Sequence, residues 1–369
     1  MRTPERIPVV TPGGAYEVSV GPGLLHTVGS TVRRLLPGAR CFLVTDDNVA
    51  TLYGDIVETS ILQAGVQLFV ARQPAGEQTK SWHEAGMMME LMSEAGFGRD
   101  SVVVALGGGV VGDLAGFVAS VYMRGVPVIQ VPTSLLAQVD SSIGGKTGVD
   151  LRHGKNLAGT YWQPLAVLAD TSCLETLPED EWRCGFAEVA KSAILAGPAQ
   201  MDALESALPA LRVADEAAVT AAVLMAAGFK ANVVSGDERE ASGREQLNYG
   251  HTLGHAIERE LGYGTISHGV GVAEGIRFAA RLSARLGGAS PEWVDRQERL
   301  LDGLGLWRRG FDIVPGRLLS AMHADKKARD GRVRFVLSTA PGEWTAAALG
   351  DDILLEELET WRDTGKDFA

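Results

Sequence analysis

The sequence predicts an α/β N-terminal domain with a parallel sheet, followed by a mostly α-helical C-terminal domain. In the first half, short β-rich runs alternate with helical patterns, and one apolar run ends in three glycines. The second half is rich in Ala, Leu, Glu and Arg with helical periodicity almost throughout. Because strands that alternate with helices form βαβ units, their strands lie parallel. We place the two domains at residues 1–178 and 179–369.

Apolar runs and helical periodicity predict the individual elements. The predicted strands of the first domain cover residues 39–45, 65–71, 101–106, 126–131 and 165–170, with a helix at 80–95. Asp46-Asp47-Asn48 is typical of a turn that caps a helix. In the second domain, helices are predicted at 178–195, 199–211, 215–235, 250–261, 269–286 and 291–304, with a returning strand at 333–337.

Length and composition indicate a soluble globular protein. The chain has 369 residues, of which 46% are hydrophobic and 22% charged, enough for two cores. A net charge of -12 repels a phosphate backbone, so we expect no nucleic-acid partner. The N-terminal residues lack the apolar segment of a secretory signal, and no apolar run is long enough to cross a membrane. Three cysteines without CxxC spacing predict reduced thiols in a cytoplasmic protein.

The segment 101–113, SVVVALGGGVVGD, is a candidate phosphate site. A strand runs into Gly107, Gly108 and Gly109 and then into a helical pattern. Glycines let the backbone approach a ligand, and the helix N-terminus offers free N–H groups and a positive dipole end. The spacing is not G-x-G-x-x-G, so the usual dinucleotide fingerprint is absent. A tight strand-to-helix turn without a ligand is the other interpretation.

Polar and basic residues in apolar surroundings predict an anion site. They are Arg124, Asp140, Lys146, Lys155, Asn156, Lys191, Lys230, Arg244, Lys326 and Lys327. Lysines that glycines flank in a loop can point at an anion whose oxygens also accept backbone hydrogen bonds, which favours Lys146 and Lys155. Solvated surface lysines are the alternative for each of them.

Histidines cluster in the second domain and suggest a metal site. His251 and His255 are four apart, on one face if the segment is helical, and His268 follows. Neutral imidazoles and a carboxylate such as Glu188 are the ligands that a catalytic zinc prefers. Structural hydrogen bonding is the other interpretation. The pattern H-E-x-x-H is absent because Thr252 replaces the glutamate, so a metalloprotease is not expected.

Taken together, five segments resemble the dehydroquinate synthase family of sugar-phosphate cyclases. They are residues 107–125, 131–164, 174–191, 237–258 and 325–337, in the expected order along the chain. The resemblance implies a Rossmann-like NAD-binding domain, a helical metal-binding domain and an active site in the cleft between them. It also implies a homodimer, in which Arg124 reaches the neighbouring subunit's site.

The resemblance assigns residues to three groups. Glu188, His251 and His268 are implied as ligands of one zinc or cobalt ion, whereas His255, which spacing alone would favour as a ligand, is implied to face the substrate phosphate. The implied NAD contacts are Asp46, Asn48, Glu77, Lys80, Gly109, Val110, Val111, Gly112, Asp113, Thr133, Ser134, Lys146, Lys155 and Thr176. The implied substrate contacts are Asp140, Lys146, Asn156, Lys191, Lys230, Arg244, Asn248, His255 and one of Lys326 and Lys327.

The implied reaction closes 3-deoxy-D-arabino-heptulosonate 7-phosphate into a carbocycle with loss of phosphate. NAD takes a hydride and the same NADH returns it, so no net redox change is expected. The substrate phosphate itself is the implied base, and the protein supplies cations that hold it. Several cations around one site suit a substrate that carries both a phosphate and a carboxylate.

The chain departs from the family pattern after His268. It reads His-Gly-Val-Gly-Val, whereas the common pattern is His-Gly-Glu-Ala-Val. The change to Val270 and Gly271 concerns the surroundings of His268 rather than the ligand itself.

Four other functions remain to be weighed. An aminodehydroquinate synthase has nearly the same motifs, and a 2-deoxy-scyllo-inosose synthase acts on glucose 6-phosphate. The latter substrate lacks the carboxylate that Arg244 suits. A metal-dependent polyol dehydrogenase shares the architecture but would release NADH. A non-catalytic binding protein is disfavoured because the three implied ligands and the glycine segment occur together.

Overall fold

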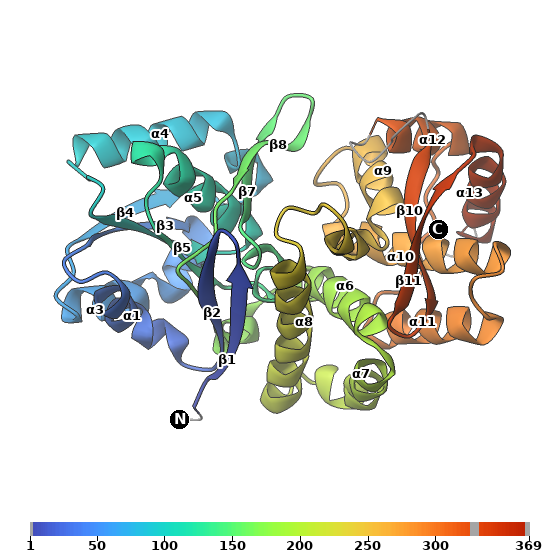
Figure 1. Ribbon diagram of the computed structural model, residues 1–369, viewed down its shortest axis with the longest axis horizontal. Helices are drawn as coiled ribbons and strands as arrows, with labels where there is room; N and C mark the ends of the chain where they lie inside the picture. The colour runs from blue at the N-terminus through green and yellow to red at the C-terminus, as the bar shows by residue number, and fades with distance from the viewer. Residues whose placement is uncertain (1–2, 325–331, 366–369) are drawn as a thin grey trace. The chain divides into compact units, whose positions relative to one another are not determined.

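The computed structural model describes residues 3–324 and 332–365 (Figure 1). Contacts divide the chain into two compact units. The first unit comprises residues 1–177 and 219–239, and the second comprises residues 178–218 and 240–369. The segment 219–239 therefore packs with the first unit, although it follows residue 178 in the sequence.

A seven-stranded sheet forms the centre of the first unit, with the order β1-β2-β9-β6-β5-β3-β4. The strands are β1 (Glu5–Thr11), β2 (Gly14–Gly21), β3 (Arg40–Asp46), β4 (Leu68–Gln73), β5 (Ser101–Gly107), β6 (Val128–Pro132) and β9 (Ala166–Asp170). All neighbours are parallel except β1 and β2, which form an antiparallel edge hairpin. Every residue of β5 is buried, as expected for a central parallel strand that helices cover on both faces.

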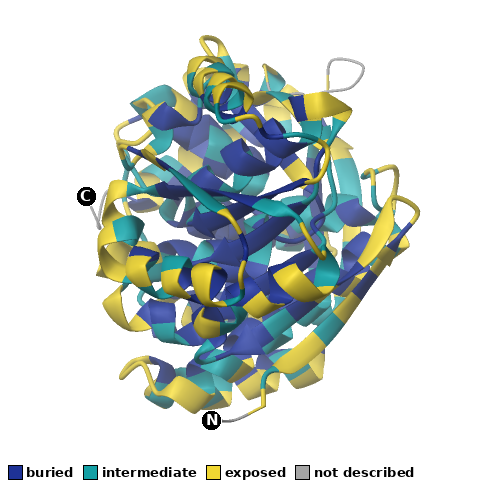
Figure 2. Ribbon diagram, turned by 90° about the vertical axis from the view of Figure 1, so that its left-hand side faces the viewer, coloured by how far each residue is buried: buried dark blue, intermediate teal, exposed yellow. Residues whose placement is uncertain are grey.

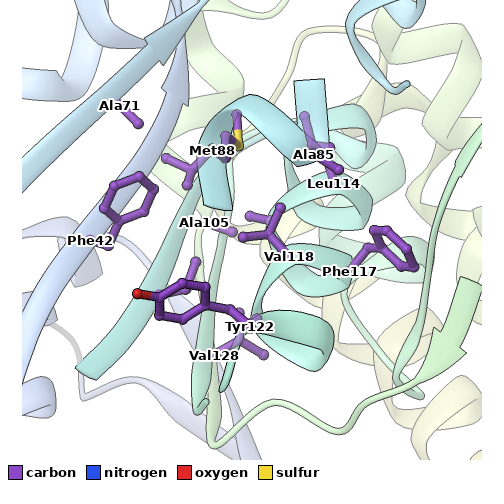
Figure 3. Packing of buried hydrophobic residues seen from close by; sticks show 14 of the residues in the cluster. Phe42, Ala71, Ala85, Met88, Ala105, Leu114, Phe117, Val118, Tyr122 and Val128 are labelled. Carbon is purple, nitrogen blue, oxygen red and sulfur yellow. The ribbon is translucent and has the colours of Figure 1, made fainter. Parts of the chain in front are cut away.

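Helices cover both faces of this sheet. They are α1 (Val28–Leu35), α2 (Asp47–Val49), α3 (Asp55–Gln63), α4 (Trp82–Glu94) and α5 (Gly109–Val121). Because side chains alternate along a strand, Cys41 and Leu43 pack with α1 and α3, whereas Phe42 packs with α4 and α5. Figure 3 shows Phe42, Val118 and Tyr122 among the residues of this second core. In Figure 2 the central strands are mostly dark blue, whereas the helices on the outside carry yellow, exposed residues.

A hairpin and a long helix complete the first unit. The antiparallel hairpin consists of β7 (Lys146–Leu151) and β8 (Gly154–Tyr161), and β7 packs against α5. Most of α8 (Glu216–Gly236) belongs to this unit. Among the described helices, α8 alone is long and apolar enough to cross a membrane, but half of its most apolar window is buried within the protein. It also carries the buried Lys230, as a core helix of a soluble protein can.

The second unit is mostly helical around α10. Its elements are α6 (Glu179–Ala196), α7 (Pro198–Leu211), α9 (His251–Leu261), α10 (His268–Arg285), α11 (Pro291–Gly303), α12 (Pro315–His323), β10 (Val333–Ala340), β11 (Glu343–Leu349) and α13 (Asp351–Gly365). The helix α10 contacts α6, α9 and α11, and most of its residues are buried. The strands β10 and β11 form an antiparallel hairpin, and β10 packs on α10.

The structure confirms the predicted fold class, and every predicted strand and helix lies within a few residues of an observed one. One local prediction was wrong: Lys146 and Lys155 lie on the paired strands β7 and β8, not in a loop. The glycines there serve strand pairing. A Cβ on Gly159 would lie 2.4 Å from the carbonyl oxygen of Thr147, so only glycine allows the two backbones to approach.

Candidate active site

The helix α6 places Glu188 inside the second unit. Three acidic residues, Glu179 to Glu181, occupy its first turn, where the positive end of the helix dipole stabilises their negative charge. Glu188 lies in the buried middle of the helix and is 1% exposed. Lys191 follows one turn later on the same face, is equally buried, and forms an ion pair with Glu188.

The three histidines come from the beginnings of two helices. His251 is the first residue of α9, after Gly250 in the left-handed conformation, and His255 follows one turn later. His268 is the first residue of α10. The ring centroid of His251 lies 5.3 Å from the ring centroid of His255 and 5.3 Å from that of His268. His251 and His255 therefore share one face of α9, as predicted, and His268 at the start of α10 lies beside them.

Glycines let the backbones of the three helices approach closely. A Cβ on Gly275 of α10 would lie 1.7 Å from the carbonyl oxygen of Gly250, at the start of α9. A Cβ on Gly269 would lie 2.4 Å from Cα of Cys184 in α6. No side chain fits either position without moving a helix. These contacts hold the starts of α9 and α10 near Glu188.

The side chains of Glu188, His251 and His268 converge on one point. Oε1 of Glu188 lies 3.5 Å from Nε2 of His251 and 3.7 Å from Nε2 of His268. One ligand atom from each residue lies within 4.8 Å of the others. Donors that each lie about 2.1 Å from a tetrahedral zinc are about 3.4 Å apart, so this spacing suits one divalent cation.

The charge of Glu188 also suits a cation. Burial alone would raise the pKa of Glu188, but Lys191 and His268 outweigh burial and hold the pKa at about 2. Within the described residues, neither buried carboxylate oxygen has a hydrogen bond of good geometry. A buried, ionised carboxylate with two facing imidazoles fits the donor set of a zinc or cobalt site.

Lys191 and the segment just before α9 carry the other implied substrate residues of the second unit. Lys191 donates a hydrogen bond to the carbonyl oxygen of Leu247 at 2.8 Å. The short helix η7 (Gly243–Asn248) carries Arg244, which is 1% exposed, and Asn248, which donates to Oε1 of Glu240 at 2.6 Å. These residues immediately precede α9, so the same segment supplies polar groups and metal-ligand candidates.

In the first unit, the buried Lys230 pairs with Asp140, whose side chain is 27% exposed. Nζ of Lys230 lies 2.7 Å from Oδ1 of Asp140 and 2.6 Å from its carbonyl oxygen. Lys230 comes from α8, and Asp140 comes from a single helical turn, η5 (Ala137–Ser141), after β6. The sequence predicted both residues as substrate contacts, and the structure brings them together.

The glycine segment lies at the carboxyl ends of the parallel strands. The strand β5 ends at Gly107 and α5 begins at Gly109, whose added Cβ would lie 3.1 Å from Oγ of Ser141. The first-turn amides of α5 point out of the helix end, as an anion site requires. The N–H of Thr133, which follows β6, donates to the carbonyl oxygen of Gly107 at 3.0 Å.

Asp46 ends β3 and caps α2 by accepting from the N–H groups of Asn48 and Val49. This row of groups fits a dinucleotide at the edge of an open parallel sheet.

Lys80 lies beside the glycine segment in a cluster of carboxylates. Its Nζ lies 3.1 Å from Glu77, 3.3 Å from Asp113 and 3.9 Å from Asp150. Lys155 lies 3.4 Å from Glu77. Burial raises the pKa of Asp113 to about 6 although Lys80 opposes this shift. Four implied NAD contacts are thus neighbours.

Of the remaining predicted residues, Asn156 adjoins the Lys80 cluster, because its N–H donates to Oδ1 of Asp150 at 2.8 Å. Arg124, Lys146 and Asn156 are exposed, and Thr176 accepts or donates a hydrogen bond with the hydroxyl of Tyr53 at 2.5 Å. Lys326 and Lys327 lie outside the described residues. The backbone of Arg124 is left-handed, with φ 68°.

Sequence reasoning missed two carboxylates. Asp150 belongs to the Lys80 cluster, and Glu258 lies 3.4 Å from Nδ1 of His268. Glu258 had a detectable signal, since it follows His255 by three residues on the same face of a predicted helix. Asp150 had none, because the hairpin that brings it to Lys80 was not predicted.

Comparison with known proteins shows one consistent similarity. The profile of the 3-dehydroquinate synthase N-terminal domain matches residues 70–184, and that of the C-terminal domain matches residues 185–328. The chain is 45% identical to 3-dehydroquinate synthase of Rhodospirillum rubrum over 353 residues, which cover 94% of this chain and 90% of that protein.

Two solved structures share the fold. A 2-deoxy-scyllo-inosose synthase in complex with carbaglucose-6-phosphate, NAD+ and Co2+ has a TM-score of 0.89 at 24% identity, over 97% of this chain and 99% of that one. A 2-epi-5-epi-valiolone synthase from Streptomyces hygroscopicus with NAD+ and Zn2+ has a TM-score of 0.86 at 25% identity, over 97% and 98% of the two chains.

Proposed function

Because the chain belongs to the 3-dehydroquinate synthase family, we propose that it converts 3-deoxy-D-arabino-heptulosonate 7-phosphate into 3-dehydroquinate and inorganic phosphate. The convergence of Glu188, His251 and His268 carries this proposal. The 45% identity to a named 3-dehydroquinate synthase supports this substrate over those of the other cyclases, for which the two comparison structures show 24% and 25% identity.

NAD and one divalent ion are the proposed cofactors. Bound NAD supplies a reversible hydride acceptor, and a zinc or cobalt ion supplies a Lewis acid. The residues of the chain provide the binding groups. Glu188, His251 and His268 would hold the ion, and the glycine-rich start of α5 would hold the pyrophosphate. The NAD+ and Co2+ or Zn2+ of the two structurally similar cyclases support these assignments.

The cationic side chains would bind the two anionic ends of the substrate. We assign the carboxylate to Arg244, whose planar guanidinium can bind a carboxylate through two hydrogen bonds. We assign the phosphate to His255 with lysines of the predicted set. Their positive charge stabilises phosphate as it leaves, and this stabilisation grows as negative charge develops. The buried state of Lys191 and Lys230 keeps these charges from being screened by water.

The backbone of the turn after α5, residues Tyr122–Arg124, supports the proposal of a homodimer. Met123 and Arg124 both have positive φ, 53° and 68°, and Met123 is 45% exposed. Strained non-glycine residues persist where the surroundings require them, and this turn would present Arg124 to a second subunit. Mixing Arg124→Ala and His251→Ala subunits tests this: recovery of activity in mixed dimers supports a shared site, and its absence contradicts one.

A cytoplasmic location is proposed from the cysteines. Cys41, Cys173 and Cys184 are all free and buried, and burial raises the pKa of Cys41 and of Cys184 to about 12. Protonated, buried thiols are stable in a reducing compartment and form no disulfide framework.

The test is an assay of phosphate and NADH in parallel. Metal-loaded protein with catalytic NAD is incubated with the heptulosonate phosphate and, separately, with glucose 6-phosphate. Phosphate release from the heptulosonate without accumulation of NADH supports the proposal. Lasting NADH accumulation would instead indicate a polyol dehydrogenase, and phosphate release from glucose 6-phosphate alone would indicate a deoxyinosose synthase. Parallel turnover of the amino analogue of the heptulosonate separates the aminodehydroquinate alternative.

A further inference from the structure

Glu258 lies on the far side of His268 from Glu188. Its Oε2 is 3.4 Å from Nδ1 of His268, while Nε2 of the same ring is 3.7 Å from Oε1 of Glu188. The imidazole therefore stands between two carboxylates, with one ring nitrogen toward each. Glu258 is 4% exposed, so its contact with the ring is shielded from water.

The fold brings Glu258 to this position through α9. Glu258 follows His251 by seven residues and His255 by three, so the three side chains share one face of the helix. The helices α9 and α10 touch at Gly254 and Gly271, where a Cβ on Gly254 would lie 2.9 Å from the backbone of Gly271. This close contact sets the face of α9 against the first turn of α10. Val270, which stands where the family pattern has glutamate, supplies no carboxylate there.

Nδ1 of His251 also has an acceptor, but this acceptor is a backbone carbonyl and not a carboxylate. Its Nδ1 lies 3.1 Å from the carbonyl oxygen of Tyr249, and its Nε2 faces Glu188. A backbone carbonyl can only accept a hydrogen bond, which places the proton on Nδ1 and the lone pair on Nε2. Both rings are thus oriented the same way, one by a carbonyl and the other by a carboxylate.

We propose that Glu258 is a positioning residue that accepts a hydrogen bond from Nδ1 of His268 and so directs the Nε2 lone pair toward the divalent ion. The inference rests on the metal centre of the proposed function. A carboxylate partner orients the ring, fixes its tautomer and increases its basicity as a ligand.

The alternative role for Glu258 is that of a ligand. His255, Glu258 and His268 also have ligand atoms within 4.8 Å of one another. A cation at that position would use Nδ1 of His268. Simultaneous occupation of both positions would require the ring to lose both of its protons, whereas the positioning role needs only the neutral imidazole. The two roles predict different metal stoichiometries.

The test is cobalt binding to metal-free wild-type protein, Glu258→Gln and Glu258→Ala, with Glu260→Gln as the matched control. Glu260 lies on the same helix, is 15% exposed at its side chain and pairs with Arg317 at 2.6 Å. Affinity is measured by competition with a chelator, and the visible absorption of bound cobalt reports the ligand geometry. We expect Glu258→Ala to weaken binding about 10- to 100-fold and to change the spectrum. Glu258→Gln keeps an oxygen acceptor and should lose less, and the control should match wild type.

Three results would overturn the inference. Wild-type affinity and spectrum in Glu258→Ala would show that the carboxylate does not orient His268. Two cobalt ions per wild-type chain and one in both Glu258 variants would make Glu258 a ligand. Failure of the wild-type protein to bind cobalt would remove the metal centre itself. By contrast, a normal cobalt complex in a protein that does not convert the heptulosonate phosphate would contradict the proposed function alone.

Discussion

Two buried clusters, one in each unit, have opposite arrangements of charge. In the first unit, the cation Lys80 lies among the carboxylates of Glu77, Asp113 and Asp150. In the second, the carboxylate of Glu188 faces Lys191 and two imidazoles. The Lys80 cluster contains its own cation at the centre. The Glu188 cluster has a carboxylate and the ring nitrogens of two histidines directed at one point.

The donor atoms indicate which cluster suits an added ion. Burial alone would lower the pKa of Lys80, but the three carboxylates outweigh burial and raise it, so the lysine stays charged. Both clusters contain a lysine, since Lys191 pairs with Glu188, so charge alone does not distinguish them. The second cluster combines oxygen and nitrogen donors at the spacing of a metal site, and an external cation would complete it.

The largest effect is expected from loss of the Glu188 carboxylate. Glu188→Ala should reduce phosphate release by at least about a thousandfold, because a bound metal contributes several kcal/mol of transition-state stabilisation. Glu179→Ala on the same helix is the control, since its side chain is 79% exposed and pairs only at the surface with Arg183. Near-normal turnover in Glu188→Ala would contradict the assignment of this cluster as the reaction centre.

Removal of the Lys80 cation should destabilise the first unit, because the carboxylates around it would then repel one another. Lys80→Met should lower the free energy of unfolding by about 3–5 kcal/mol, because it leaves buried carboxylates without their shared partner. Lys155→Met, at a side chain that is 26% exposed, should cost about 1 kcal/mol or less. Urea unfolding of both variants measures the difference. Equal losses would mean that Lys80 is not the centre of the cluster.

A pH dependence should distinguish Asp113 from an ordinary carboxylate. Its pKa in the folded protein is raised to about 6 by burial, against about 3.9 in an unfolded chain. The folded state therefore binds the proton more tightly, and the stability that this proton contributes is lost as pH rises from about 4 to 6. The loss amounts to at most about 3 kcal/mol. Relative to Asp113→Asn, wild-type unfolding free energy should fall across this window; a constant difference would contradict the raised pKa.

The smallest expected effects concern the glycines. Gly275→Ala should destabilise the protein by about 1–3 kcal/mol and weaken metal binding, because the new methyl group collides with the carbonyl of Gly250. Gly228→Ala in α8 is matched to it, since nothing lies within 4 Å of its added Cβ. That variant should gain about 0.5–1 kcal/mol from helix propensity. Thermal unfolding compares the two, and destabilisation of similar size in both would remove the argument for close packing.

The sequence predicted the elements of the two units well because their apolar periodicity is strong. It also indicated that His251 and His255 share a helix face, which α9 confirms. It could not show that β7 and β8 pair, since glycines that permit close strands look like loop residues. Nor could it show the approach of Gly275 to Gly250, or of Glu258 to His268, because these contacts join helices through tertiary packing. The roles of individual site residues remain predictions.

The metal content of purified protein tests the central claim most directly. Wild-type protein and the variants Glu188→Ala, His268→Ala and Asp113→Asn are dialysed against zinc and analysed by mass spectrometry for bound metal. We expect one ion per chain in wild type and Asp113→Asn, and none in Glu188→Ala and His268→Ala. Stoichiometric zinc in the last two variants, or its loss in Asp113→Asn alone, would place the ion elsewhere and contradict the account.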